Sequence, residues 1–332
     1  MSYLALVGGI ALLLFCGDLL VRGAVGLAER LGIPAIIIGL TVVAFGTSAP
    51  ELVVSLKAAL ANSPGIAIGN VVGSNIANVL VVLGLPALIA TTDCDQTDIV
   101  RNSVYVLLAS ILFIALCFLG PLTVWHGIIL LAAMALFLVD TGRRGADRRN
   151  GKAAKPGCGP QMVEAVDGVS GVPHTSLGML AFILLGLIGL PAGGHLTVGA
   201  AARQLAAQWG VSEAAIGLTV VALGTSLPEL ATTLVAAVRR HCGLALGNVL
   251  GSNLFNILAV IGTASVITPI SVPERFLDLD LWVMLFTTLM IMPFVISRRT
   301  LTRLPAFGFL VAYVAYITLV MLPRQAAFAA GF

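Results

Sequence analysis

The sequence predicts an all-α membrane protein with ten transmembrane helices arranged as two inverted five-helix repeats. Three observations lead to this prediction. Only 10% of the 332 residues are charged and 59% are hydrophobic, whereas soluble domains contain about 25% charged residues. Ten apolar stretches are long enough to cross a bilayer. One block of sequence recurs 178 residues later, at a distance that covers five of these stretches.

A spanning helix needs about 20 apolar residues. We place the helices at about 3–22, 34–61, 66–91, 102–119, 123–141, 176–194, 213–238, 243–268, 279–297 and 304–323. The stretch 102–139 contains no charged residue, and Gly120 and Pro121 divide it into two helices joined by a tight turn. The first stretch has no basic region before it, so we interpret it as a membrane helix and not as a cleaved signal peptide.

The helices fall into two groups of five around one long polar segment. We predict a first inverted repeat at 1–141, a linker at 142–175 and a second inverted repeat at 176–332. The linker contains Gly and Pro together with six basic residues, Arg143, Arg144, Arg148, Arg149, Lys152 and Lys155. Its composition indicates a flexible connection and not a further domain.

The basic residues indicate the orientation in the cell membrane. With the N-terminus outside, the cytoplasmic connections hold fourteen of the 18 Lys and Arg residues. The outer side keeps Arg203, Arg275 and Arg324, and Lys57 lies within the second span. Cytoplasmic loops of membrane proteins are enriched in Lys and Arg. We therefore expect both termini outside and the 142–175 linker in the cytoplasm.

The two groups of helices share a duplicated block. Gly39–Gly84 aligns with Gly217–Gly262 without a gap, and 27 of the 46 positions are identical. Equivalent points are five spans apart, and an odd number of spans reverses the direction of the chain across the membrane. Inverted repeats are common in secondary transporters. A duplicated channel or a structural helix bundle is the alternative explanation.

The duplicated block contains a predicted helix break. Pro50 lacks an N–H group and Gly46 adds conformational freedom, so we expect the helix to break near residues 45–49. Broken helices at membrane depth are tolerated where they line a protein-enclosed cavity. Oxygen ligands could come from freed carbonyls and from hydroxyl groups on both sides of the duplication: Ala44, Ala222, Thr47, Ser48, Thr225 and Ser226.

Glu51 and Glu229 follow the two breaks directly. A carboxylate in the bilayer centre costs about 3 kcal/mol, and two that converge at a symmetry axis repel each other unless a cation lies between them. Oxygen ligands in a flexible cage suit calcium or several sodium ions. The alternative is structural, because Ser48-x-x-Glu51 and Ser226-x-x-Glu229 also match a capping box, in which Glu bonds to helix amides.

The second part of each block carries neutral polar residues at helical spacing. Ser74 and Asn78 share one helix face, as do Ser252 and Asn256. Their oxygens could complete the coordination of a cation, or they could hold helices together as polar contacts. The nearby GxxxG pairs, Gly69 with Gly73 and Gly247 with Gly251, predict close helix packing.

The paired blocks GTSAPE and GTSLPE, each followed by GNVxGSN, resemble the two alpha-repeats of the calcium/cation antiporter superfamily, and in particular prokaryotic sodium/calcium exchanger-like proteins. The resemblance implies ten helices in two inverted groups of five, with Glu51 and Glu229 as the principal cation ligands. It also implies accessory ligands, namely Thr47, Ser48, Ser74, Asn78, Thr225, Ser226, Ser252, and the carbonyls of Ala44 and Ala222.

The resemblance leaves the ion stoichiometry open. Some family members carry Asp where this chain has Asn256, so the site here has two carboxylates. Proton-coupled relatives typically carry Glu soon after the second Gly-Asn pair, and this chain has none there. We expect exchange of calcium for sodium by alternating access. The alternatives are proton-coupled antiport of calcium or another divalent cation, and a passive cation channel.

The sequence shows no nucleotide-binding loop and no nucleophile paired with a base, so neither an ATP-driven pump nor an enzyme is expected. We expect no cofactor. The expected partners are the transported inorganic cations, Ca²⁺ and Na⁺, and the lipid bilayer, with no nucleic acid. The sequence does not determine the oligomeric state.

Overall fold

The computed structural model describes residues 2–90, 97–149, 172–173, 175–198, 213–297 and 299–321, and every named element in them is a helix. The first half contains α1 (Ser2–Leu31), α2 (Ala35–Ile38), the π-helical turn η1 (Gly39–Val43), α3 (Ala44–Thr47), α4 (Ala49–Leu60), α5 (Pro64–Ala77), η2 (Asn78–Leu83), α6 (Gly84–Ile89), α7 (Thr97–Phe118) and α8 (Val124–Arg149). The second half contains α10 (Ser176–Val198), α12 (Glu213–Ile216), η3 (Gly217–Val221), α13 (Ala222–Thr225), α14 (Leu227–Val238), α15 (Cys242–Leu254), η4 (Phe255–Val260), α16 (Ile261–Ile267), η5 (Phe276–Asp280), α17 (Leu281–Ile296) and α18 (Arg303–Met321).

The local structure of the duplicated block is repeated at the turns that end α4 and α14. The turns that follow α4 and α14 are equivalent, with Asn62 at φ 60° and Arg240 at φ 61° in the left-handed region. Equivalent backbone hydrogen bonds close the two turns, among them those from Ser63 to the Ala58 carbonyl (2.9 Å) and from His241 to the Ala236 carbonyl (2.8 Å). Residues 61–64 and 239–242 share no identical position, so the turn is repeated although its sequence is not.

The first helix is longer than its apolar stretch. The predicted span ends at residue 22, but α1 continues to Leu31 and stops at Gly32, whose φ of 64° is left-handed. Asp18 forms an ion pair with Arg22 at 2.6 Å and also pairs with Arg239 in the turn between α14 and α15. Apolar composition marks where a helix meets the bilayer interface, whereas backbone conformation decides where it ends.

The described helices suit a membrane protein in length and composition. Eight of them are long and apolar enough to cross a bilayer, and two further pairs, α2–α3 with α4 and α12–α13 with α14, are each bent by 43°. Counting each bent pair as one span gives ten. The tight turn predicted at Gly120 and Pro121 is confirmed, since α7 ends at Phe118, Gly120 has φ 118°, and α8 begins at Val124.

The helices α5 and α15 form the buried centre, and each packs against the bent pair of the opposite half. The packing role predicted for the glycines is confirmed. A Cβ on Gly73 would lie 2.5 Å from the Leu218 carbonyl oxygen, and one on Gly251 would lie 2.7 Å from the Leu40 carbonyl oxygen. Only glycine allows these helices to approach so closely.

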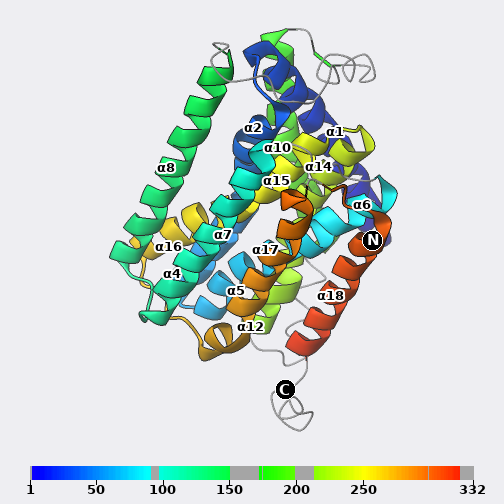
Figure 1. Cartoon of the computed structure of the whole chain (residues 1–332). Coiled ribbons are helices and arrows are strands. Elements are labelled where there is room, and N and C mark those ends of the chain that lie inside the picture. The colour runs from blue at the N-terminus through cyan, green and yellow to red at the C-terminus, as the bar shows by residue number, and fades with distance from the viewer. Residues whose placement is uncertain are drawn as a thin grey trace.

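The outer helices present apolar side chains. In Figure 1, α8 and α18 lie on opposite sides of the molecule, with α5, α15, α7 and α17 between them. Leu136 on α8 is 72% exposed and Leu304 on α18 is 81% exposed, whereas Glu51 and Glu229 are completely buried. Large apolar residues outside and carboxylates inside reverse the pattern of a soluble protein and fit a lipid-facing surface.

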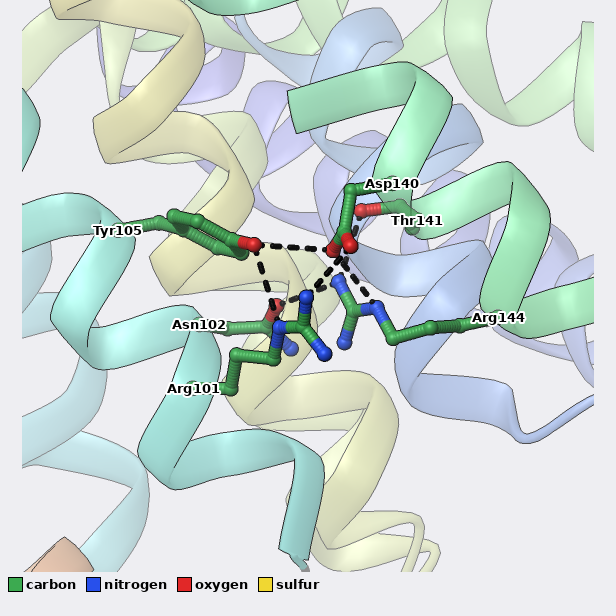
Figure 2. A network of polar contacts seen from close by, with 6 residues as sticks. All are labelled: Arg101, Asn102, Tyr105, Asp140, Thr141 and Arg144. Atoms are coloured by element: carbon green, nitrogen blue, oxygen red, sulfur yellow. Dashed lines mark hydrogen bonds and ion pairs between the residues drawn. The ribbon is translucent and has the colours of Figure 1, made fainter. Parts of the chain in front are cut away.

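Polar networks join the last two helices of each half. Figure 2 shows Asp140 of α8 receiving hydrogen bonds from Arg101 (2.5 Å) and Tyr105 (3.0 Å) of α7. In the second half, Asp280 receives hydrogen bonds from Arg275 (3.1 Å) and from Tyr316 of α18 (3.0 Å).

Part of the predicted linker is helical, and the α7–α8 network holds it against α7. Arg144 pairs with Asp140 at 2.9 Å and also donates to Asn102 and Thr141, at 3.2 and 3.0 Å. Residues 142–149 therefore form the last turns of α8. Residues 150–171 and 174 of the predicted linker lie outside the described residues.

Candidate cation site

The helix breaks lie where the sequence predicts them, at Ser48 and Ser226. Ser48 has ψ 7° and Ser226 has ψ 4°, which interrupts the helical conformation between α3 and α4 and between α13 and α14. Pro50 and Pro228 in the next turn have no N–H to donate to the carbonyl four residues before them. Each break therefore places its glutamate in the first turn of a new helix, at the positive end of the helix dipole.

Two hydrogen bonds cross between the halves and bring the two glutamates together. The Ser48 hydroxyl donates to Glu229 Oε1 at 2.9 Å, and the Ser226 hydroxyl lies 3.5 Å from Glu51 Oε1. Neither serine makes a side-chain capping hydrogen bond. The capping-box alternative is therefore wrong for the serine side chains, because each serves the carboxylate of the opposite half.

A second pair of crossed contacts surrounds the first. The Thr47 hydroxyl donates to Asn248 Oδ1 at 3.3 Å, and the Thr225 hydroxyl donates to Asn70 Oδ1 at 3.1 Å. These four residues occupy equivalent positions, 178 residues apart, in the duplicated block. The contacts follow the same approximate two-fold relation as the serine–glutamate pairs.

Asn70 and Asn248 were missed as site residues because the sequence prediction treated them only as part of the motif. A signal was available in the sequence. Both Asn70 and Asn248 precede a predicted ligand serine by four residues, which places them on the same helix face. The polar stripe on each central helix is therefore one turn longer than predicted: Asn70, Ser74 and Asn78 on one side, and Asn248, Ser252 and Asn256 on the other.

Several buried oxygens of the two glutamates and of these stripes lack a hydrogen-bond partner among the described residues. They include one oxygen of each glutamate, Oε2 of Glu51 and Oε2 of Glu229. The others are Oγ of Ser74, Oγ of Ser252, Oδ1 of Asn78 and Oδ1 of Asn256. Buried unpaired polar atoms are costly and rare in native proteins. Oxygen ligands are the ones that calcium and sodium require, so a cation would satisfy these atoms.

The approximate symmetry is broken at the two asparagines that end the stripes. Asn78 donates to Asn253 Oδ1 at 3.0 Å and thus forms a polar contact between the halves. Neither amide atom of Asn256 has a partner among the described residues. Asn78 therefore links helices while its oxygen remains unpaired, and Asn256 has its whole amide group available.

The expectation that the helix breaks free the carbonyls of Ala44 and Ala222 is wrong. Each accepts the N–H of the serine at the break, Ser48 or Ser226, at 3.0 Å. The helical hydrogen bond to these carbonyls survives because the prolines stand two residues further on. Proline removes the donor to the carbonyl four residues before it, which is that of Gly46 or Gly224.

The described residues contain no group of three or more His, Cys, Asp or Glu side chains that could hold a metal ion. The charge of the site therefore comes from Glu51 and Glu229, and its other oxygens are neutral. The number of charged ligands tunes the affinity of an oxygen site for a cation.

Comparisons with known proteins match nearly the whole chain. The family model described as sodium/calcium exchanger protein matches residues 1–140 and 178–322. The chain is 36% identical to the putative antiporter CaxA of Alkalimonas amylolytica, over 93% of this chain and 95% of that protein. It is 28% identical to the sodium/calcium exchanger MaX1 of Methanosarcina acetivorans, over 95% of this chain and 97% of that protein.

Solved structures of the sodium-calcium exchanger NCX_Mj share the fold. One of them, soaked with sodium and strontium, superposes with a TM-score of 0.77 at 29% identity, over 96% of this chain and 97% of that chain. The apolar helices and these matches identify a multi-pass membrane protein. On the family match, which covers both halves and their duplicated motifs, the chain belongs to the sodium/calcium exchanger protein family.

Proposed function

We propose that this chain is a secondary active antiporter that exchanges calcium for sodium by alternating access. The observation that carries the proposal is the crossed pairing of Ser48 with Glu229 and of Ser226 with Glu51. It joins one carboxylate from each half in a single buried site whose second carboxylate oxygens are unpaired. A cation bound there would neutralise both glutamates and so lower the cost of passing through a dry intermediate.

Glu51 and Glu229 are the principal ligands in this proposal. The accessory ligands are the hydroxyls of Thr47, Ser48, Ser74, Thr225, Ser226 and Ser252, the amide oxygens of Asn78 and Asn256, and the second lone pairs of the Ala44 and Ala222 carbonyls. We further propose that residues 1–141 and 176–332 form two inverted five-helix repeats. Such repeats support alternating access, because each half can open to one side in turn.

Sodium is favoured over the proton as the coupling ion. The polar stripes 70–78 and 248–256 contain only neutral side chains, which can bind sodium without titrating. A proton-driven carrier needs a carboxylate that titrates near working pH, and Glu51 and Glu229 would then have to bind calcium as well. MaX1, a relative over nearly its whole length, is named a sodium/calcium exchanger.

Flux measurements in liposomes test the proposal. In calcium-loaded proteoliposomes, an inward sodium gradient should drive calcium efflux, and a pH gradient in sodium-free buffer should not. Efflux that follows the pH gradient and ignores sodium would indicate the proton-coupled alternative. Calcium leakage without any counter-ion would indicate a passive channel. Replacing calcium with manganese or strontium in the same assay measures which divalent cations are carried.

A further inference from the structure

Asn70 and Asn248 each touch both halves of the candidate site. Asn70 Nδ2 donates to the Glu51 carbonyl at 3.2 Å and to the Ser55 hydroxyl at 2.9 Å. Asn70 Oδ1 accepts the hydroxyl of Thr225 from the opposite half at 3.1 Å. One fully buried side chain thus holds the backbone of its own glutamate and a threonine across the symmetry axis.

Asn248 repeats this arrangement in the second half. Its Nδ2 donates to the Glu229 carbonyl at 3.4 Å and to the Thr233 hydroxyl at 3.0 Å. Its Oδ1 accepts the Thr47 hydroxyl at 3.3 Å. The same three contacts occur in both halves, which indicates that the two asparagines share a role and do not make these contacts by chance.

The contacts determine which way each amide faces. The Glu51 carbonyl can only accept, so the atom of Asn70 beside it must be the Nδ2 donor. The reverse orientation would place two acceptors together. Oδ1 therefore faces Thr225, and the same reasoning places Oδ1 of Asn248 against Thr47.

The direction of each amide in turn directs the threonine hydroxyl. A hydroxyl has one proton and two lone pairs. When the proton points at the asparagine oxygen, the two lone pairs of the hydroxyl remain available for another partner. A cation can be that partner, because it is coordinated by oxygen lone pairs. Without the asparagine oxygen, only backbone carbonyls of the preceding turn compete for the proton, and it can turn toward the ion and oppose its binding.

We propose that Asn70 and Asn248 are positioning residues of the cation site, which hold Thr225 and Thr47 with their lone pairs available to the ion. The inference rests on the proposed function, because it assumes that a cation binds between Glu51 and Glu229. The two threonines differ in one respect. Thr225 also lies 3.1 Å from the Val221 carbonyl and 3.2 Å from the Ala222 carbonyl, whereas the alternative acceptor for Thr47 is the Ala44 carbonyl at 3.5 Å. Asn248 should therefore matter more than Asn70.

A double-mutant cycle on the full-length chain tests the inference. The readout is the Kd for Ca²⁺, measured by calorimetry in sodium-free detergent solution. Residues that orient metal ligands typically change metal affinity by about 10-fold or more, so Asn248→Ala should raise the Kd about 10-fold. Thr47→Val should do the same, and the double variant should be within about two-fold of either single variant, because both changes remove one coupled unit. Asn70→Ala should raise the Kd by a smaller factor.

The matched control is Asn102→Ala, in which a buried asparagine of the α7–α8 network is truncated in the same way. It should keep the wild-type Kd within about two-fold. Wild-type Kd values for both Asn248→Ala and Asn70→Ala would overturn the inference, as would additive effects of Asn248→Ala and Thr47→Val. If Asn248→Ala does not fold, the double-mutant cycle of Asn70→Ala with Thr225→Val tests the inference, and additive effects on the Kd would again overturn it. Absence of Ca²⁺ binding by the wild-type protein would instead reject the proposed function itself.

Discussion

At the scale of single residues, Glu51 and Glu229 combine complete burial with incomplete hydrogen bonding. Each has one oxygen directed to a serine of the opposite half and one without a partner among the described residues. Two carboxylates in a poorly solvated site repel each other unless a cation or protons neutralise them. In the proposed function, their arrangement therefore favours ion binding at the expense of stability in the ion-free protein.

Glu51→Gln and Glu229→Gln should each abolish exchange and leave a folded, membrane-inserted protein. Glutamine keeps the shape of the side chain but removes a charge that a divalent ion requires. The melting temperature without ions should stay the same or rise, because the repulsion between the carboxylates is removed. Proteoliposome flux and thermal unfolding in detergent measure the two effects. Glu29→Gln, at an exposed position of α1, is the control and should transport normally. Normal calcium flux in either site variant would reject the proposed site.

At the scale of elements, the site depends on how closely the central helices approach the broken ones. Gly73 of α5 and Gly251 of α15 let these helices touch the backbone of η3 and η1 in the opposite half. The approach brings Asn70 and Asn248 within hydrogen-bond distance of Thr225 and Thr47. Small residues at helix crossings therefore determine the geometry of the polar contacts beside them.

Gly73→Ala and Gly251→Ala should each destabilise the protein by about 1–3 kcal/mol, the usual cost of overpacking a core. The added Cβ would lie 2.5 and 2.7 Å from backbone oxygens, which cannot move aside as a flexible side chain would. Thermal unfolding measures the loss. Gly308→Ala on α18 is the matched control, since nothing lies within 4 Å of the new methyl group. Equal melting temperatures for all three variants would show that the central helices separate without cost.

At the scale of the whole molecule, the two halves carry related but unequal features. Asp140 and Asp280 each join the last two helices of one half, but with different arginine and tyrosine partners. Arg101 and Arg144 lie on the side where most basic residues gather in the predicted topology, and Arg275 lies on the opposite side. If the predicted topology holds, this asymmetry in charge places the Arg101–Arg144 end of the protein in the cytoplasm.

Tags at either terminus should be reachable from the outer face of the membrane, and a tag inserted in residues 150–170 should be reachable only from the cytoplasm. The reason is the distribution of basic residues, with fourteen of 18 in the predicted cytoplasmic connections. Labelling with a membrane-impermeant reagent in intact cells and in inverted vesicles measures accessibility. Labelling of the 150–170 tag in intact cells would show that the orientation or the number of spans is wrong.

The sequence by itself determined the apolar spans, the two helix breaks and the pair of buried carboxylates. Each follows from a local rule. The bilayer core sets the length of an apolar stretch, the closely spaced glycine and proline of each motif predict a helix break, and the glutamates lie next to the breaks in the chain. The duplication added the expectation that each half carries an equivalent helix break followed by a glutamate.

Only the tertiary structure decided the partners of the polar side chains. Ser48-x-x-Glu51 satisfies the spacing of a capping box, so the sequence alone could not show that Ser48 bonds to Glu229. The same holds for Asn248 and Thr47, which are 201 residues apart. A hydrogen bond between distant segments depends on how closely their helices pack. The distance between two packed helices depends on all the side chains along their interface, so it cannot be predicted from a local sequence pattern.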